Sequence, residues 1–254
     1  HADVRRMLML MRSQIEAMRA VAYTAAAQVD MSHHASGDEA RATAERRLSL
    51  LTPVVKGWCT EKSEEVTSLG IQIHGGMGYV EETGAAQHYR DARILAIYEG
   101  TNGIQAADLA GRKVLGDEGQ EIRKLIGELR EVCAGMRDDE ALAAIADAVS
   151  AGLDQLEQGV EWLLANAMSH PAALGASSFN MLMLTGTVLG AAYLAKGVAA
   201  ATAAGGTDAG LLKEKVATTA FYCAHVLPRA QGYLAAMMAD PEITMALPAD
   251  AFLD

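Results

Sequence analysis

The sequence contains little proline, few aromatic residues and few cysteines, and each shortage narrows the possible folds. Its 254 residues include five prolines and three cysteines, and aromatic residues make up only 5%. The cysteines Cys59, Cys133 and Cys223 lie far apart, and none belongs to a CxxC pair. We therefore expect no disulfide framework and no zinc or other metal site, and we expect a reducing, cytoplasmic environment.

Positive charge is also scarce. The chain has 21 Lys and Arg residues against 32 Asp and Glu residues, which gives a formal net charge of −11. Nucleic acids and anionic membranes attract proteins through clustered lysines and arginines. We therefore expect neither a nucleic-acid partner nor a general membrane-surface partner.

Long hydrophobic runs are absent except for residues 179–195. This run is short for a membrane span and contains asparagine and threonine side chains. We interpret it as a helix buried in a helical bundle rather than as a membrane span. Gly186, Gly190 and Gly197 would allow a neighbouring helix to approach it closely.

Helix-forming residues fill the rest of the chain, so we predict an all-α fold. Apolar side chains recur every three or four positions, and no segment alternates as a strand would. A polar loop is expected at 30–40, and Thr52 followed by Pro53 is typical of an N-cap and a first-turn proline. Helices are expected at about 4–29, 52–73, 85–93, 101–114, 119–136, 139–168, 174–204 and 208–239.

The polar, glycine-containing stretch LGDEGQ at 115–120 is the best candidate for a domain boundary. We predict a first helical bundle over residues 1–115, a linker at 116–120 and a second bundle over residues 121–254. Long helices joined by short loops are typical of an antiparallel four-helix bundle, which we expect for the second part.

The segment IYEGTNGIQ at 97–105 contains an isolated acidic residue between an aromatic residue and a glycine. Thr101 is a suitable N-cap for a following helix, so Glu99 would stand on a turn just before a helix N-terminus. Such a carboxylate can be a simple capping charge. Alternatively, it can be a general base that a loop presents to a cleft, and the spacing leaves both interpretations open.

The segment QIHGGMGY at 72–79 raises a similar question. Consecutive glycines after a helix can simply end and turn it. They can also let backbone N–H groups approach a phosphate or a cofactor, because no Cβ atom blocks the way. Glycine spacing alone does not decide between these roles.

Taken together, the two segments resemble a known family. The stretch QIHGGMGYVEETGAAQHYRDARILAIYEGTNGIQ at 72–105 is similar to the C-terminal segment of the acyl-CoA dehydrogenase flavoproteins. The order and spacing of the glycine loop, the RDAR helix and the YEGT loop carry this resemblance. Residues 1–115 are similar to that family's C-terminal helical bundle without its first helix, and residues 121–254 to the extra helical domain of its longer subfamily.

The resemblance implies roles for six residues. It implies that Glu99 is the base that removes the α-proton of an acyl thioester. The backbone N–H of Glu99 is then expected to donate a hydrogen bond to the thioester carbonyl. Tyr98 then lines the acyl pocket together with Glu99. The expected FAD contacts are Gln72, Gly75, Gly76 and Thr101, with the glycine loop reaching towards a neighbouring subunit.

The resemblance also implies an FAD cofactor, an acyl-CoA substrate and electron-transfer flavoprotein as the electron acceptor. It further implies a homodimer or a higher homo-oligomer. The family's N-terminal helical domain and β-domain have no counterpart in this sequence, so we expect the chain alone to be inactive. The alternative is a helical assembly module without activity, and flavin absorbance would distinguish the two.

Overall fold

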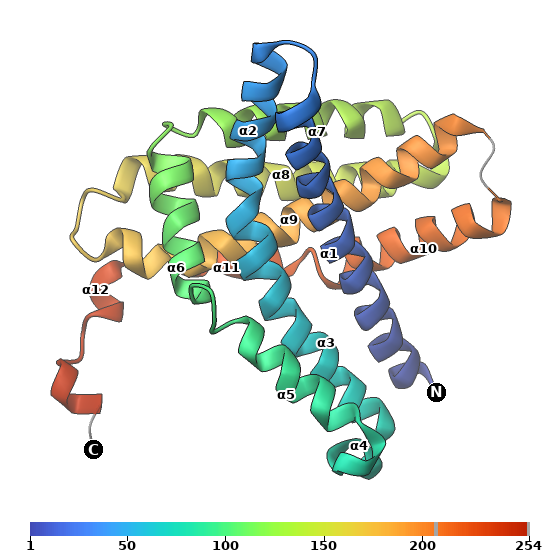
Figure 1. Ribbon diagram of the computed structural model, residues 1–254, viewed down its shortest axis with the longest axis horizontal. Helices are drawn as coiled ribbons and strands as arrows, with labels where there is room; N and C mark the ends of the chain where they lie inside the picture. Colours follow the sequence, from blue (N-terminus) through green and yellow to red (C-terminus); the bar gives the residue numbers. More distant parts are fainter. Residues whose placement is uncertain (206–207, 253–254) are drawn as a thin grey trace.

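The computed structural model describes residues 1–205 and 208–252, which fold into helices joined by short turns (Figure 1). The predicted all-α fold is confirmed, because these ranges contain no strand. Two π-helical segments are η1 (Val54–Trp58) and η3 (Asp108–Leu115), and two short 3-10 helices are η2 (Glu81–Thr83) and η4 (Ala249–Phe252). The α-helices are α1 (Ala2–His34), α2 (Asp38–Pro53), α3 (Cys59–His74), α4 (Gly76–Tyr79), α5 (Ala85–Leu95), α6 (Asn102–Ala107), α7 (Gln120–Met136), α8 (Glu140–Asn166), α9 (Ala173–Ala204), α10 (Ala209–His225), α11 (Arg229–Met237) and α12 (Pro241–Thr244).

Helices α1 and α2 form a hairpin with a very short turn. The loop predicted at 30–40 is wrong for most of its length, because α1 continues to His34 and α2 begins at Asp38. Histidines in the last turn of α1 and acidic residues in the first turn of α2 suit the helix dipoles at these ends. Gly37, with φ of 92°, reverses the chain between the two helices.

The helix predicted to begin at Thr52 does not begin there. The hydroxyl of Thr52 instead donates a hydrogen bond to the carbonyl oxygen of Leu48, at 2.8 Å, inside a continuous helical run from residue 38 to residue 74. Pro53 would clash with the carbonyl four residues earlier in a regular α-helix. The wider turn of η1 follows directly and accommodates it.

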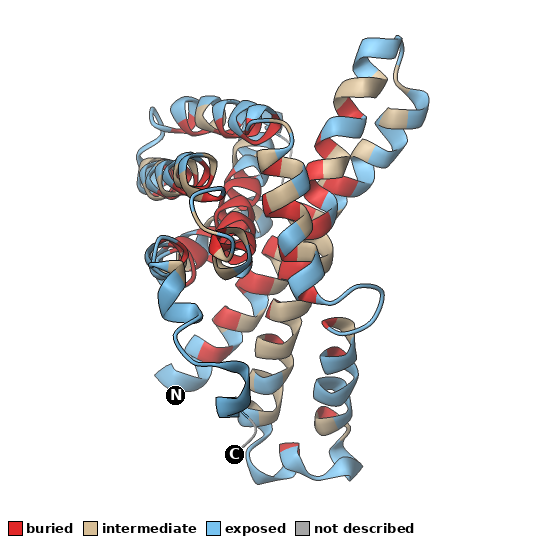
Figure 2. Ribbon diagram, turned by 90° about the vertical axis from the view of Figure 1, so that its left-hand side faces the viewer, coloured by how far each residue is buried: buried red, intermediate tan, exposed pale blue. Residues whose placement is uncertain are grey.

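Helix α9 passes through the centre of the molecule, where the buried residues concentrate (Figures 1 and 2). Every residue from 181 to 195 is buried. Gly186 and Gly190 face the fully buried Trp58: an added Cβ would lie 2.5 Å from Cδ1 of Trp58 at Gly186 and 3.0 Å from its Cη2 at Gly190. The prediction that a neighbouring segment approaches the glycines of this helix closely is confirmed at Gly186 and Gly190. It is wrong at Gly197, where an added Cβ would meet nothing within 4 Å.

By length and composition, α9 could also cross a membrane. It is the one helix in the described ranges that passes this test, and 89% of its most apolar window is buried inside the protein. A helix surrounded by its own chain on nearly all sides serves as a core helix, as the sequence analysis expected.

The second half of the chain departs from a regular four-helix bundle. The helix predicted at 208–239 is two helices, α10 and α11. The N–H groups of Val226 and Leu227 both donate to the carbonyl oxygen of Tyr222 at 2.9 Å, which closes α10, and Pro228 has no N–H to continue it. Residues 206–207, in the break predicted before this segment, lie outside the described residues.

Both halves contribute to one hydrophobic core. Its buried side chains include Leu51 and Trp58 from the first half and Leu153 and Leu189 from the second. At 116–119 the chain turns between η3 and α7, where Glu118 and Gly119 have positive φ angles of 57° and 73°. The division into two domains at this turn stays a prediction.

A buried ion cluster also joins the two halves. The guanidinium of Arg47 on α2 donates to Glu121 at 2.6 Å and to Glu128 at 2.9 and 3.0 Å, and both acceptors lie on α7. The side chains of Arg47 and Glu121 are only 10% and 7% exposed. Two charges removed from water in this way stabilise the fold only as a pair.

Candidate functional site

The candidate residues lie on an arm of the molecule formed by α3, α4 and α5. These helices project away from the central core and end in a tip at α4 (Figure 1), and most of the arm is exposed or half-buried (Figure 2). The arm returns to the core through residues 96–101, which lead into α6. The glycine segment forms the tip of the arm, and the YEGT segment forms its return to the core.

The tip has a conformation that depends on glycine at two positions. Gly75 ends α3 with φ of 62° and ψ of −146°, a region that other residues rarely adopt. Gly78 is buried, and a Cβ there would overlap the carbonyl oxygen of Ile71. These two glycines therefore serve the turn itself.

Gly76 has no such role within the chain. Its φ is not positive, and an added Cβ would meet nothing within 4 Å. Gly76 and Gln72 are both exposed, so backbone and side chain at the tip are open to a ligand from outside. An open glycine backbone of this kind fits a group that must approach closely, as a dinucleotide phosphate does.

Glu99 stands on the return segment in an uncommon conformation. Its φ is 54°, and Gly100 follows with φ of 88°. Glu99 is exposed, and no described residue forms a hydrogen bond or ion pair with its carboxylate or accepts a hydrogen bond from its N–H. Tyr98 beside it is 45% exposed. The carboxylate and the backbone N–H of Glu99 are thus both free to meet a ligand.

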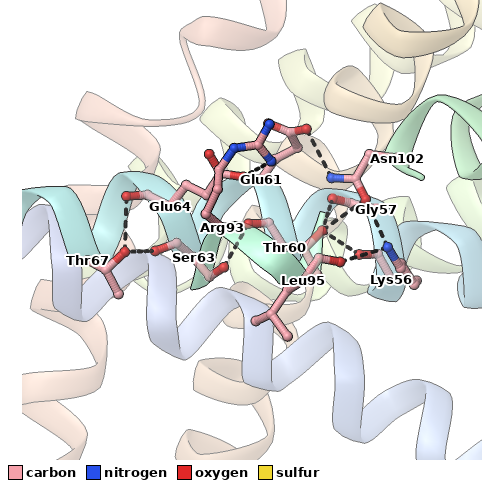
Figure 3. A network of polar contacts seen from close by, with 10 residues as sticks. All are labelled: Lys56, Gly57, Thr60, Glu61, Ser63, Glu64, Thr67, Arg93, Leu95 and Asn102. Carbon is pink, nitrogen blue, oxygen red and sulfur yellow. Dashed lines mark hydrogen bonds and ion pairs between the residues drawn. The ribbon is translucent and has the colours of Figure 1, made fainter. Parts of the chain in front are cut away.

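Both ends of this return segment are held in place. At its start, the ammonium of Lys56 donates to the carbonyl oxygen of Leu95 at 2.8 Å (Figure 3). At its end, the N–H of Asn102 donates to the carbonyl oxygen of Ala96 at 3.1 Å. Residues 96–101 therefore form a short closed loop rather than a free segment.

The side chain of Asn102 joins the loop to α3. Asn102 is only 4% exposed, and its Oδ1 accepts hydrogen bonds from Thr60 at 3.0 Å and from Lys56 at 3.4 Å. Its Nδ2 donates to Glu61 at 2.9 Å. Lys56, Thr60 and Glu61 were not predicted from the sequence, because their hydrogen bonds with Asn102 span more than forty positions and have no local pattern.

Thr101 is the N-cap of α6, as predicted. Its Oγ1 accepts a hydrogen bond from the N–H of Ile104 at 3.4 Å. The hydroxyl hydrogen of Thr101 remains available to donate to an anion such as a phosphate. Thr101 is exposed, so a ligand could reach it from outside the chain.

The structure brings only some of the candidates together. Tyr98, Glu99 and Thr101 share one loop, whereas Gln72 and the glycines lie at the other end of α5. Helix α5 has 11 residues, which corresponds to about 16 Å at roughly 1.5 Å per residue. The two groups therefore face different parts of a bound molecule, or two different molecules.

Other chemistry near the loop is limited. Burial raises the pKa of the Cys59 thiol, at the start of α3, to about 12, so this thiol stays protonated and unreactive. The described ranges contain no group of three or more His, Cys, Asp or Glu residues that could hold a metal ion. Glu99 is the exposed carboxylate of the loop.

Two family models match this chain. The model described as "Acyl-CoA dehydrogenase, C-terminal domain" matches residues 1–114. The model described as "Acetyl-CoA dehydrogenase C-terminal like" matches residues 125–248. Together the two matches leave only short stretches of the chain unassigned.

Curated relatives carry related names. The chain is 46% identical over 237 residues to the 3-methylmercaptopropionyl-CoA dehydrogenase of Ruegeria pomeroyi, which covers 89% of this chain and 39% of that protein. It is 31% identical over 101 residues to "Caffeyl-CoA reductase-Etf complex subunit CarC" of Acetobacterium woodii, covering 40% of this chain and 23% of that protein. The chain thus spans about two fifths of the length of the relatives that it matches over most of its own length.

A solved structure has a similar fold. The crystal structure of an acyl-CoA dehydrogenase complexed with FAD from Bacillus anthracis matches 95% of this chain and 44% of its own, with a TM-score of 0.70. The two sequences are 20% identical over the match. This likeness concerns the fold alone.

Proposed function

Because the chain belongs to the acyl-CoA dehydrogenase family, we propose that it is part of an FAD-dependent enzyme that dehydrogenates an acyl-CoA thioester between Cα and Cβ. One observation carries this proposal. Glu99 is presented on a loop that is held at both ends, with its carboxylate and its N–H both without partners among the described residues. A carboxylate that caps a helix through a hydrogen bond would instead accept from a free N–H of that helix.

Glu99 is the base of the proposed reaction. One of its carboxylate oxygens takes the α-proton, and the electron pair of that C–H bond becomes the new double bond as a hydride leaves Cβ. The backbone N–H of Glu99 donates to the thioester oxygen, where negative charge develops. Tyr98 contributes an apolar wall beside the same carbon atoms.

FAD, when bound, supplies the acceptor for the hydride from Cβ. The residues of this chain that would hold it are Gln72, Gly75, Gly76 and Thr101. The backbone at Gly76 is open, and the hydroxyl hydrogen of Thr101 is free to donate to a phosphate. These features suit a dinucleotide, so the residues present fit the cofactor.

A second copy of the chain is also part of the proposal. The glycine tip and the Glu99 loop lie at opposite ends of α5, and this separation supports a tip that contacts a cofactor held by a neighbouring subunit. Met77 and Tyr79 at the tip are 60% and 82% exposed, although both side chains are largely apolar. A homodimer or a higher homo-oligomer would cover them.

Electron-transfer flavoprotein is the proposed electron acceptor. Its support is the name of the Acetobacterium woodii relative, a subunit of a complex with Etf. The proposed compartment is the cytoplasm, and the free thiols of Cys59, Cys133 and Cys223 support a reducing environment.

The alternative is an assembly module without chemistry. The large second half of the chain favours it, because residues 121–254 contribute none of the six candidate residues. Under this alternative, the purified protein that contains this chain is colourless. The proposed enzyme is yellow and shows flavin absorbance.

The test compares Glu99→Gln with a matched control in the enzyme that contains this chain. The control is Glu118→Gln, because Glu118 is another exposed glutamate with positive φ, at 57°, and lies outside the site. After anaerobic mixing with acyl-CoA, flavin absorbance should fall about 10² to 10⁴ times more slowly in Glu99→Gln than in wild type. Acyl-CoA binding and thermal stability should stay unchanged. Equal rates in Glu99→Gln and Glu118→Gln would contradict the proposal.

A further inference from the structure

Lys56 reaches the Glu99 loop from a distant part of the chain. It lies 43 positions before Glu99, on the π-helical segment η1. From there its ammonium contacts the end of α5 and the side chain of Asn102, which begins α6 (Figure 3). It also lies 6.0 Å from the centre of the Tyr98 ring. We propose that Lys56 is a positioning residue for Glu99, acting together with Asn102; this inference rests on the proposed function.

The contacts of Lys56 fix the start of the loop. Its Nζ donates to the carbonyl oxygen of Leu95, in the last turn of α5, where helix carbonyls have no partner within the helix. The same Nζ lies 6.0 Å from the centre of the Tyr98 ring, within range of a cation–π contact. One half-buried cation therefore holds the residues on the N-terminal side of Glu99.

Asn102 fixes the end of the loop and links it to Lys56. Its Oδ1 accepts from Lys56 and from Thr60, and its Nδ2 donates to Glu61. Lys56 and Thr60 are one helical turn apart, so η1 and the start of α3 present both donors to the same amide. The loop is thus attached at its two ends to one rigid helical surface.

The π-helical segment η1 directly follows Pro53. A π-helical turn holds one more residue than an α-helical turn, so it rotates the side chains that follow it. Lys56 lies within that turn, so the irregularity helps to direct it towards the loop. Arg93, the cation nearest to the loop on α5, pairs with Glu64 at 3.2 Å and does not replace Lys56.

The conformation of Glu99 depends on this attachment. A glutamate with φ of 54° followed by a glycine with φ of 88° is stable only where the surroundings impose it. Without the ammonium of Lys56, the carbonyl of Leu95 is released, and Glu99 can relax to a negative φ. Such a change moves the carboxylate, and a misplacement of about 1 Å can reduce a rate by roughly 10²-fold.

The test measures chemistry and stability separately in the enzyme that contains this chain. Lys56→Met removes the donor and keeps the aliphatic stem. Its matched control is Lys113→Met, because Lys113 lies on the other π-helical segment and donates to Ser49 at 2.8 Å, away from the loop. The measured quantities are kcat, KM for acyl-CoA, and the deuterium isotope effect with an α-deuterated substrate.

Lys56→Met should lower kcat about 10- to 100-fold, change KM less than about 3-fold and increase the α-deuterium isotope effect. Lys56→Arg should restore at least about a third of kcat, because the cation and its donors return. Lys113→Met should keep both kcat and the isotope effect. Equal kinetics in Lys56→Met and Lys113→Met would overturn the inference.

Two further variants keep the result decisive. If Lys56→Met does not fold, Thr60→Val removes the hydroxyl that donates to Asn102 at 3.0 Å, which is shared with the carbonyl oxygens of Lys56 and Gly57 at 2.8 and 3.0 Å. This variant should lower kcat about 3- to 10-fold with a larger isotope effect. If Thr60→Val kept the wild-type kcat and the wild-type isotope effect, the inference would be overturned. Glu99→Gln separates the two levels, because an active Glu99→Gln contradicts the proposed function itself.

Discussion

Gly186→Ala should destabilise this protein, although alanine is the better helix former. Gly186 lies in the buried middle of α9, directly against the indole of Trp58. An added methyl group would overlap Cγ of Trp58 and lie 2.5 Å from its Cδ1 and Cδ2. Carbon atoms in contact prefer a separation of about 3.5 to 4.0 Å, so the ring or the helix must move.

The size of the effect follows from two opposing contributions. Alanine in place of glycine favours the helix by about 1 kcal/mol. Overpacking a well-filled core typically costs about 1 to 3 kcal/mol, and sometimes more. Trp58 is fully buried, so packing on every side limits how far the ring can move away. We expect a net loss of up to about 2 kcal/mol in the free energy of unfolding, which is the cost of overpacking less the gain in helix propensity.

The assay is urea unfolding of Gly186→Ala beside a control on the same helix. Gly197→Ala places the methyl group where nothing lies within 4 Å, so it should gain about 0.5 to 1 kcal/mol from helix propensity. Each kcal/mol corresponds to about 2 to 4 °C in Tm for a chain of this size. Equal or greater stability of Gly186→Ala relative to Gly197→Ala would refute the close packing of α9 against Trp58.

Three further predictions concern the ion cluster and the glycine tip. Arg47→Met should lower the free energy of unfolding by about 3 to 5 kcal/mol, measured by urea unfolding, because it leaves Glu121 buried without its partner. The hydrogen bond from Arg47 lowers the pKa of Glu128 below its ordinary value of 4.5. The contribution of Glu128 to stability is therefore complete above pH 4.5 and is lost as the pH falls below that value. Arg47→Met should flatten this pH dependence, measured as the free energy of unfolding from pH 6 to pH 3. Gly76→Ala should keep the wild-type Tm but retain less FAD on dialysis. Gly75→Ala should lower Tm, because the backbone at position 75 has a φ of 62°. Equal Tm values in the two variants would contradict these assignments.

The sequence predicted the helical fold well where periodicity and capping are local. Thr101 caps α6 as expected, because a threonine before a helix satisfies a nearby N–H without help from the rest of the fold. The same reasoning failed at Thr52 and Pro53, where the pattern of a helix start lies inside a continuous helix. Trp58, five residues after Pro53, is buried against α9, and a tertiary contact of this kind leaves no local signal.

In the candidate site, too, the features with a local sequence signal were predicted and those that depend on tertiary contacts were not. The motif drew attention to Glu99 and Gly76, and their exposure and lack of partners suit a ligand-binding role. Lys56 was not predicted, because a lysine on an amphipathic helix is usually solvated, and its contact with Leu95 depends on how α3 and α5 pack. Residues that contact substrate can follow from a motif, whereas residues that hold them in place require the fold.

The central claim is that Glu99 removes the α-proton, and exchange of that proton tests it most directly. The enzyme that contains this chain is incubated with acyl-CoA in D₂O, and deuterium at Cα is followed by NMR. Wild type should exchange the α-proton, and Glu99→Gln should exchange it at least about 10²-fold more slowly while binding acyl-CoA equally well. Wild-type exchange in Glu99→Gln would show that another group takes the proton and that Glu99 is not the base.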